Sequence, residues 1–532
     1  MDWWRSAAIY QVYPRSFADA NGDGIGDLAG VRAHLGHLRD LGVDAIWFSP
    51  WYPSPMADAG YDVADYRDID PMFGTLEEAE QLIREAHDLG LRIIVDVVPN
   101  HCSDQHRWFQ EALGARLGDP ARDRFWFRAG AKNGPPNDWQ STFGGPAWTQ
   151  LPDGEWYLHL FAREQPDFNW NHPEVRAEFE DVLRFWFDRG VDGIRIDSAA
   201  MCVKDPALPP VTDGNPHPYV DQDGTHEIYR SWRRIADSYD SPRALIGEVW
   251  LADTDRFAAY LRPDEMHTAF NFDFLGCPWD AKALRRVVDD TLASHAAVGA
   301  PSTWVLSNHD VTRHVTRYGR QDTAFEFALR AERHGRPTDA ELGRRRARAA
   351  ILLTCALPGS VYVYQGEELG LPEVEDLPGA VRDDPMYTRS RGADPGRDGC
   401  RVPLPWSSEG SSFGFSPAGA AAPWLPQPAE WRSLTVAEQA ADPGSMLSLY
   451  RSALGLRRSE AGLGDGPMRW LDAPADVLAF GRPGGFRCLV NLSDRAVDLP
   501  PGHRILLASG PVEGGRLAPD TAVWLRVLDS DA

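Results

Sequence analysis

The chain has 532 residues and a formal net charge of −24, from 54 Lys and Arg against 78 Asp and Glu. This length predicts one large domain with appendages rather than a single small domain. The acidic charge argues against nucleic acid or an anionic membrane surface as a partner, and it favours a neutral substrate. No apolar run is long enough to span a bilayer, so we expect no membrane association.

The cysteines and the first residues predict the cellular compartment. The residues at 1–6 contain neither a basic nor an apolar stretch of the kind that directs export. The cysteines show no close pairs, which is typical of free thiols rather than of disulfides or a zinc site. They are Cys102, Cys202, Cys277, Cys355, Cys400 and Cys488. We therefore expect a cytoplasmic protein; its oligomeric state is not indicated.

Strand-like and helical stretches alternate from the start of the chain. Residues 8–13 predict a strand and residues 28–41 an amphipathic helix. A strand at 44–49 and a helix at 76–89 follow, and 92–98 is the near-continuous apolar run of a strand buried on both faces. This repetition predicts a parallel sheet with helical crossovers.

The alternation stops between residues 102 and 169, where Trp, Phe, Gly and Pro are frequent, and this composition predicts an inserted subdomain. It resumes with strands near Ile194, Leu245, 269–274, Trp304 and 361–364. Eight strands are enough to close a barrel.

The last part of the chain has another pattern. Residues 366–428 are rich in Gly and Pro and predict loops, whereas alternating strands after a helix at 446–457 predict an antiparallel β domain. The predicted fold is therefore an α/β (β/α)8 TIM barrel at 1–101 and 170–445, with an inserted subdomain at 102–169 after the third strand and a C-terminal antiparallel β domain at 446–532.

Three of the predicted strands end in an acidic residue. Residues 191–197 place Arg195 and Asp197 on one face of a buried strand. Buried charges persist only when they are paired or used, so this stretch alone favours a structural ion pair and a catalytic carboxylate equally. Glu248 and Asp310 follow apolar runs in the same way. Repeated strand-then-carboxylate endings are what a parallel barrel with its active site at one rim requires.

Four short motifs occur in order: Asp-Val-Val-Pro-Asn-His at 96–101, Gly-Ile-Arg-Ile-Asp at 193–197, Gly-Glu-Val-Trp at 247–250 and Ser-Asn-His-Asp at 307–310. With them the chain resembles the glycoside hydrolases of the α-amylase superfamily (family 13), closest to the α-glucosidase and oligo-1,6-glucosidase group. Gln-Pro-Asp-Phe-Asn-Trp at 165–170 resembles the stretch that marks the oligo-1,6-glucosidase subgroup. The resemblance implies that the insertion forms one wall of the substrate pocket.

The resemblance also implies the catalytic roles. Asp197 matches the nucleophile of a retaining mechanism and Glu248 its acid/base, whereas Asp310 matches a third carboxylate that binds sugar hydroxyls. Sequence spacing alone does not decide which carboxyl group has which role. Arg195 is expected at the substrate site, where it keeps Asp197 ionised, because a nearby cation lowers the pKa of a carboxylate.

Further residues match sugar-binding positions of the family. His101 and His309 each close a motif and are expected to hydrogen-bond the glucose unit that is cleaved. Tyr61 and Asp62 match a pair in which the ring stacks on the sugar and the carboxylate binds its distal hydroxyls, as in an exo-acting pocket. From the residues alone, a turn tyrosine with a capping aspartate is the alternative.

Two more contacts are implied outside these motifs. Arg397 lies in a stretch resembling the Arg-Asp-X-X-Arg segment of the family, and we expect this arginine, rather than Arg401, to reach the sugar. Phe143 and Phe161 in the insertion are expected to be platforms for the next sugar, with core packing as the alternative.

Acidic residues and glycines alternate in one loop near the N-terminus. Asp19, Asn21, Asp23, Ile25 and Asp27 fall at every second position, a spacing that resembles a calcium-binding loop in which Ile25 offers only its carbonyl. The glutamate that closes an EF-hand is absent, and the family has a comparable loop. We expect a structural Ca²⁺ site, with Mg²⁺ or a plain acidic turn as alternatives.

Together these features predict an exo-acting α-glucosidase that releases glucose from small oligosaccharides. Ser198 follows the proposed nucleophile, and in resembling enzymes a small hydroxylated residue there accompanies α-1,4 cleavage whereas valine accompanies α-1,6 cleavage. An α-glucosyl transferase or sucrose isomerase shares the same residues and remains an alternative. A non-catalytic amylase-like binding subunit is disfavoured, because all three acids are present and no membrane-spanning stretch is found.

Overall fold

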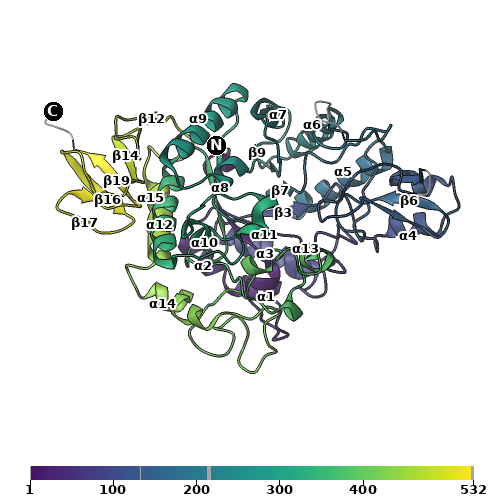
Figure 1. Cartoon of the computed structure of the whole chain (residues 1–532), viewed down its shortest axis with the longest axis horizontal. Helices are drawn as coiled ribbons and strands as arrows, with labels where there is room; N and C mark the ends of the chain where they lie inside the picture. Colours follow the sequence, from purple (N-terminus) through teal and green to yellow (C-terminus); the bar gives the residue numbers. More distant parts are fainter. Residues whose placement is uncertain (1, 132–133, 212–216, 529–532) are drawn as a thin grey trace.

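A parallel sheet forms the centre of the molecule, which the computed structural model describes over residues 2–131, 134–211 and 217–528. Its strand order is β10-β11-β1-β2-β3-β7-β8-β9, and it is rolled into a nearly closed barrel (Figure 1). The strands are β1 (Ala8–Val12), β2 (Ala45–Phe48), β3 (Arg92–Val97), β7 (Gly193–Ile196), β8 (Ala244–Gly247), β9 (Thr268–Ala269), β10 (Thr303–Val305) and β11 (Ser360–Tyr364). The predicted eight-stranded TIM-type barrel is thereby confirmed.

The barrel ladder has one gap. Every neighbouring pair in the strand order is parallel and hydrogen-bonded, but within the described residues no ladder joins β9 to β10. The hydroxyl of Thr303 on β10 donates to the carbonyl of Ala269 on β9 across this gap. A side-chain contact therefore stands where strand pairing would close the barrel.

Helices cover the outside of the barrel, and local signals fix their ends. At the start of α3, Thr75 accepts from the backbone N–H of Glu78 while the Glu78 carboxylate accepts from the N–H of Thr75, a capping box. Pro173 begins α5. The helices of the barrel layer are α1 (Leu28–Ala33), α2 (Leu35–Leu41), α3 (Leu76–Asp88), α5 (Pro173–Asp188), α6 (Gly224–Ala236), α7 (Thr254–Ala259), α8 (Phe272–Gly276), α9 (Ala281–Val298), α10 (His314–Tyr318), α11 (Arg330–Arg333), α12 (Ala340–Ala356) and α13 (Pro385–Arg389).

Two predicted elements differ from the structure. The helix expected at 28–41 is divided into α1 and α2 at His34, whose ring Nδ1 lies 2.8 Å from the Gly30 carbonyl and whose backbone leaves the helical region. The strand expected at 269–274 is only the short β9, because Asn271 caps α8 by accepting from the N–H of Phe274 at 2.9 Å.

The inserted segment forms a lobe beside the barrel, at the right of Figure 1. It contains α4 (Arg107–Gly114) and a three-stranded antiparallel sheet in the order β4-β6-β5, with β4 at Phe127–Ala129, β5 at Trp148–Gln150 and β6 at Glu155–Leu158. Trp126, Trp139 and Trp148 pack together in its core. The aromatic residues of this stretch therefore build a separate small core instead of another βα unit.

The C-terminal sheets lie at the opposite end of the molecule, drawn in yellow in Figure 1. The larger sheet has the order β12-β13-β14-β19-β16, and the smaller β15-β18-β17. Their bounds are β12 (Arg469–Trp470), β13 (Val477–Arg482), β14 (Phe486–Asn491), β15 (Val497–Asp498), β16 (His503–Ala508), β17 (Val512–Glu513), β18 (Arg516–Leu517) and β19 (Thr521–Val527), preceded by α14 (Val436–Ala440) and α15 (Met446–Ser459). Trp524 of β19 donates to the Leu352 carbonyl of α12 at 3.0 Å, which attaches this part to the barrel layer.

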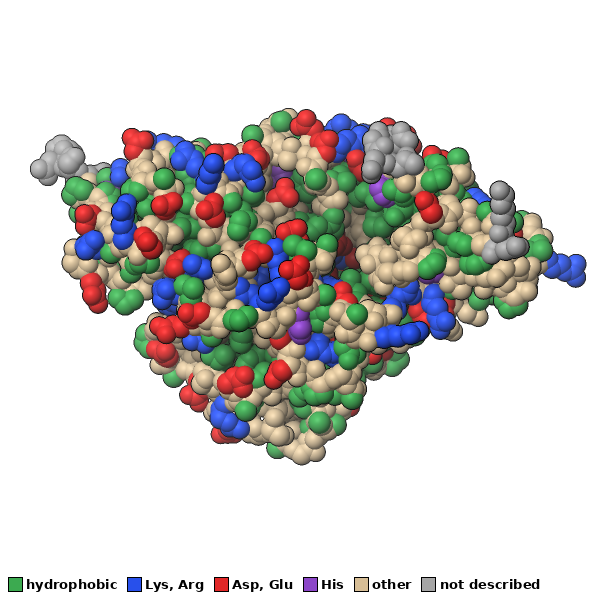
Figure 2. All heavy atoms as spheres, in the orientation of Figure 1, with side chains coloured by type: hydrophobic (Ala, Val, Ile, Leu, Met, Phe, Trp, Pro, Cys, Tyr) green, Lys and Arg blue, Asp and Glu red, His purple; other side chains and the backbone are tan. Residues whose placement is uncertain are grey.

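The surface shows mixed charge. Acidic and basic side chains are interspersed over the face drawn in Figure 2. All six cysteines are buried and unpaired. Across the described ranges, no helix combines the length and apolar character that crossing a membrane demands.

Candidate active site

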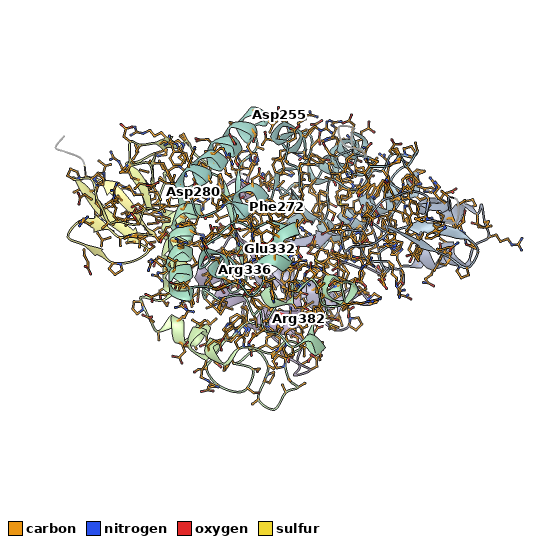
Figure 3. The ribbon with its side chains drawn as sticks, viewed as in Figure 1. Asp255, Phe272, Asp280, Glu332, Arg336 and Arg382 are labelled. Atoms are coloured by element: carbon orange, nitrogen blue, oxygen red, sulfur yellow. The ribbon has the colours of Figure 1, made fainter. Side chains whose placement is uncertain are left out.

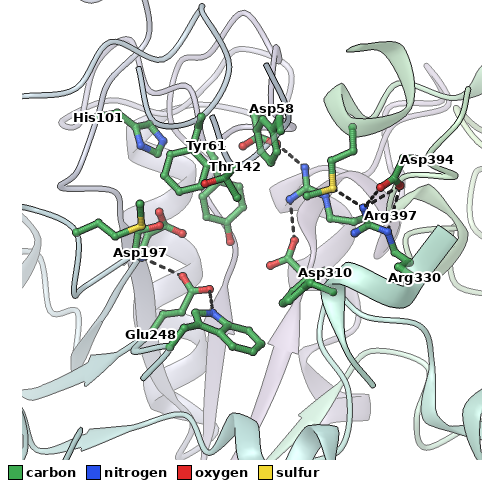
Figure 4. Close-up of a pocket in the computed structure, with 18 of the residues that line it drawn as sticks. Asp58, Tyr61, His101, Thr142, Asp197, Glu248, Asp310, Arg330, Asp394 and Arg397 are labelled. Atoms are coloured by element: carbon green, nitrogen blue, oxygen red, sulfur yellow. Dashed lines mark hydrogen bonds and ion pairs between the residues drawn. The ribbon is translucent and has the colours of Figure 1, made fainter. Parts of the chain in front are cut away.

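A cavity of about 710 Å³ lies at the carboxyl ends of the barrel strands. Asp197 directly follows β7, Glu248 directly follows β8, and Asp310 lies shortly after β10. All three line the cavity, with Asp197 and Glu248 on one side and Asp310 on the other (Figure 4). The barrel thus brings three acids from distant parts of the chain to one rim.

One guanidinium holds the first two acids. Arg195 Nη1 donates to Asp197 Oδ1 at 2.9 Å, and Nη2 lies 2.7 Å from Glu248 Oε2. Nη1 also donates to Asp96 Oδ1 at 2.9 Å. Arg195 is only 2% exposed and does not line the cavity, so it supports the acids from beneath. The expected contact of Arg195 with the substrate therefore stays a prediction.

Burial raises the pKa of two acids around this guanidinium, Asp197 and Asp96. Burial, followed by the neighbouring Glu248 carboxylate, raises the pKa of Asp197, and Arg195 acts in the opposite direction. Burial also raises the pKa of Asp96 to about 7, against the effect of Arg195. Carboxylates crowded around a single cation favour a proton within the group. A site that needs one acid and one nucleophile requires such a proton.

Arg397 connects the acidic side chains on the opposite wall of the cavity. Its Nη1 donates to Asp310 Oδ1 at 2.9 Å and its Nη2 to Asp58 Oδ1 at 2.6 Å. Its Nε donates to Asp384 Oδ2 at 2.5 Å. Arg401 also reaches Asp310 Oδ1, at 3.1 Å, but Arg397 lines the cavity and Arg401 does not. Arg397 is therefore the arginine of the two that faces the cavity, and its contact with a sugar stays a prediction.

The neighbours of Asp310 keep it ionised. Burial alone would raise the pKa of this carboxyl group, but the contact with His309 and the positive charges of Arg397 and Arg401 lower it below its usual value. Asp310 is therefore an acceptor for hydroxyl groups rather than a proton donor.

The two predicted histidines lie at different depths. His101 lines the cavity, and the amides of Asn100 and Gln165 contact its two ring nitrogens at 3.1 and 3.0 Å. His309 stacks on Tyr61 at 5.3 Å between ring centroids, does not line the cavity, and lies 3.2 Å from Asp310 through Nε2. Burial lowers the pKa of each to about 3, so both rings are neutral.

The prediction for Asp62 is wrong. This carboxylate is 0% exposed, and its oxygens accept from the backbone N–H groups of Ala57 and Asp58 at 2.8 and 2.9 Å, as in a capped turn. Tyr61 lines the cavity, and so does Asp58, through which the turn reaches Arg397. The short side chain of Asp62 is fully used in holding this turn, whereas Asp58 points inward.

The insertion and the outer loops complete the wall. Phe143 and Phe161 both line the cavity, and the Arg397 guanidinium lies 5.3 Å from the Phe143 ring centroid. Residues that sequence reasoning missed also line it: Asp58, Thr142, Trp250, Phe327, Arg330, Met386 and Asp394. Arg330 and Asp394 form an ion pair at 2.7 Å. For Trp250 a signal was available, because it closes the Gly-Glu-Val-Trp motif.

The predicted metal loop lies apart from the cavity. Asp19 accepts from the N–H groups of Gly22 and Gly24 at 2.6 and 2.9 Å, and Asp27 accepts from Gly30 at the start of α1. Asn21, Asp23 and Ile25 complete the loop, and Asn21 and Asp23 each accept from the N–H two residues ahead. In the described residues, no group of three or more His, Cys, Asp or Glu side chains is arranged to hold a metal.

Comparison with protein families matches residues 11–466 to "Alpha amylase, catalytic domain". Residues 468–524 match a second family, described only as a domain of unknown function. The chain is 38% identical to a probable alpha-glucosidase of Rhizobium meliloti (strain 1021), over 93% of this chain and 90% of the relative. It is 34% identical to an oligo-1,6-glucosidase of Parageobacillus thermoglucosidasius, over 86% of this chain and 84% of that protein.

A solved structure has the same fold over the whole chain. The crystal structure of the alpha-glucosyl transfer enzyme XgtA superposes with a TM-score of 0.85 at 35% sequence identity, covering 99% of both chains. The similarity therefore extends over the barrel, the insertion and the C-terminal sheets.

Proposed function

Because the chain belongs to the α-amylase family of glycoside hydrolases, we propose that it is a retaining, exo-acting α-glucosidase. It would release glucose from the non-reducing end of maltose-type oligosaccharides. The observation that carries this proposal is the pair Asp197 and Glu248, both held by Arg195 at the cavity wall. Two carboxylates on one planar guanidinium favour the separation of about 5–5.5 Å used for retention over the wider spacing used for inversion.

The proposed chemistry has two steps. Asp197 attacks the anomeric carbon while Glu248 protonates the leaving oxygen, which gives a covalent glucosyl-enzyme. Glu248 then removes a proton from water, which attacks the same carbon and restores Asp197. Arg195 offsets the negative charge on whichever acid is ionised at each step.

The exo mode is supported by the far wall of the cavity. Arg397, Asp58 and Asp310 form a connected polar cluster there. Hydrogen-bonding groups at fixed positions suit the several hydroxyls of a terminal glucose unit. His101 and Tyr61, which line the same cavity, supply a further polar group and a ring for the sugar face.

Glucosyl transfer is the second candidate, with sucrose isomerisation as a related outcome. It is favoured by the similarity to the transfer enzyme XgtA and by the apolar outer lining that Trp250, Phe327 and Met386 contribute. Such a lining suits an acceptor that competes with water for the same intermediate. A non-catalytic binding subunit would not require Asp197 and Glu248 to share one cation.

Product analysis tests these alternatives. The protein is incubated with maltose, isomaltose and sucrose, and products are followed by chromatography and by NMR of the first-formed anomer. An α-glucosidase releases α-glucose in proportion to the bonds cleaved, whereas a transferase yields new oligosaccharides and an isomerase converts sucrose without net hydrolysis. First-formed β-glucose would contradict the retaining mechanism.

The linkage preference is proposed to be α-1,4, from Ser198. This residue lines the cavity beside the proposed nucleophile. We expect Ser198→Val to lower the ratio of kcat/KM for maltose to kcat/KM for isomaltose. The change should correspond to roughly 1–3 kcal/mol in the difference between the two activation free energies, because valine adds apolar bulk and removes a hydroxyl group near the leaving oxygen.

The backbone at Ser198 calls for a matched control. Its φ is +45°, where a β-branched residue is strained. Ser198→Thr introduces the same branching but keeps the hydroxyl, and it should preserve the maltose preference. A wild-type enzyme that prefers isomaltose, or equal ratios in all variants, would refute the role of Ser198.

The loop containing Asp19, Asn21, Asp23, Ile25 and Asp27 is proposed to bind Ca²⁺, with Mg²⁺ as the alternative. Its donors are all oxygens, which hard divalent cations prefer, and the carboxylate oxygens of Asp19 that accept backbone N–H groups keep a second lone pair. The segment after residue 415 covers the loop, since Ala421 and Trp424 donate to the carbonyls of Gly22 and Gly24. A bound ion would therefore stabilise the native fold.

Chelation should lower the melting temperature, and added Ca²⁺ should restore it in proportion to the logarithm of its concentration. Asp23→Asn keeps an acceptor for the N–H of Ile25 but removes one charge, so it should weaken the response to Ca²⁺. An unchanged melting curve in excess chelator, with no metal found by elemental analysis, would rule the site out.

The state of the cysteines supports the proposed cellular location. Six buried, unpaired cysteines support a cytoplasmic location, where thiols stay reduced. A neutral oligosaccharide is the proposed partner, in line with the acidic net charge of −24.

A further inference from the structure

The two oxygens of Glu248 have different partners. Oε2 accepts from the N–H of Ser198 at 2.9 Å and lies 2.7 Å from Arg195 Nη2. Oε1 accepts from the indole Nε1 of Trp250 at 3.0 Å. Because Oε2 already faces a cation and an amide, a proton on this carboxyl group resides on Oε1. The Trp250 N–H therefore contacts the oxygen that would donate to the leaving group.

Neighbouring rings fix the indole in this position. Trp250 stacks on Phe272 of α8 with centroids 3.5 Å apart and planes 11° apart, and Phe327 meets it edge-on at 4.9 Å. Phe272 lies near the centre of Figure 3. Trp250 nevertheless remains 41% exposed and lines the cavity. A large aromatic side chain that stays this exposed does not contribute mainly through burial, so we interpret its position as serving a contact at the cavity.

We infer that Trp250 is a positioning residue for Glu248, and that its indole N–H holds Oε1 in the orientation from which it protonates the leaving group. The inference rests on the proposed function, in which Glu248 is the acid/base. An indole nitrogen donates and cannot accept, so it favours the ionised carboxylate that forms as the proton leaves. It thereby assists departure of the sugar and keeps Oε1 directed toward the glycosidic oxygen.

Trp250→Phe tests this inference, because phenylalanine keeps an aromatic ring that can stack on Phe272 and removes the N–H donor. The loss of activity should depend on how much the leaving group needs a proton. We expect kcat/KM to fall about tenfold for maltose but less than threefold for p-nitrophenyl α-glucoside, whose leaving group needs no proton.

A matched control is present in the C-terminal sheet. Trp470 donates through its indole to Asp289 at 2.6 Å, the same pairing of groups outside the cavity. Trp470→Phe should leave the activity on both substrates unchanged.

The outcomes separate the inference from the proposed function. If Trp250→Phe keeps wild-type activity on maltose, or loses the same factor on both substrates, Trp250 does not position the acid. If the wild-type protein cleaves neither α-glucoside, the proposed function itself fails. Circular dichroism and thermal melting of each variant check that the fold is retained.

Discussion

Replacing Asp197 with alanine is expected to lower kcat for α-glucosides by about 10⁴-fold or more, while the fold is retained. The loss follows from the proposed role of Asp197 as the nucleophile that forms the covalent bond. Arg195 keeps its contacts to Asp96 and Glu248 in the variant, so no buried cation is left unpaired. Steady-state kinetics measures the loss of kcat, and thermal melting checks that the fold is retained.

Rescue with a small anion sharpens the assignment. In Asp197→Ala, azide can occupy the space of the missing carboxylate, and the product should be β-glucosyl azide, because the attack inverts the α-configured carbon. Asp255→Ala on α7 (Figure 3), an exposed acid outside the cavity, is the control and should behave as wild type. Near-wild-type activity in Asp197→Ala would remove its role as nucleophile.

Removal of Arg397 should affect both stability and activity. Arg397→Ala removes the cation that pairs with Asp58 and leaves Asp310 and Asp384 with Arg401 alone. Breaking a buried ion pair from one side costs about 3–5 kcal/mol of the free energy of unfolding. We expect a comparable penalty on substrate binding, so that kcat/KM falls by roughly 10²–10³-fold. Denaturant melts give the change in the free energy of unfolding, and kinetics on p-nitrophenyl α-glucoside gives the change in kcat/KM.

A surface arginine provides the comparison. Arg336 pairs with Glu332 at 3.3 Å on an exposed helical turn, and both are labelled in Figure 3. Arg336→Ala should change the free energy of unfolding by less than about 0.5 kcal/mol, because exposed pairs contribute little. If Arg397→Ala behaves like Arg336→Ala, the polar cluster on the far wall does not bind the sugar.

The ends of the barrel strands could be predicted because neighbouring residues in the sequence determine them. A buried parallel strand is a short apolar run, and a carboxylate directly after it, as with Asp197 and Glu248, must lie at the rim of the sheet. The sixth strand of the barrel, β9, could not be predicted in the same way. The apolar stretch after Ala269 suits a strand or a helix equally, and the capping contact of Asn271 decides for the helix.

The turn before Tyr61 shows where local reasoning fails. Asp58 and Asp62 are both acidic and four residues apart, and nothing in their spacing tells which carboxylate holds the turn and which faces the cavity. That choice depends on Arg397, more than three hundred residues away in the sequence. The same holds for the pair of Arg330 and Asp394, which joins the first residue of α11 to a loop, neither of them in a recognisable motif.

The gap between β9 and β10 has a consequence for the shape of the active-site mouth. Glu248 follows β8 and Asp310 follows β10, so the two acids lie on either side of this seam. Rings such as Phe270 and Tyr362, 4.7 Å apart between centroids, pack next to it inside the barrel. Regions with fewer backbone hydrogen bonds open at lower free energy. We therefore expect the mouth to widen more readily between Glu248 and Asp310, to admit a bulkier leaving group, than between strands that a ladder joins.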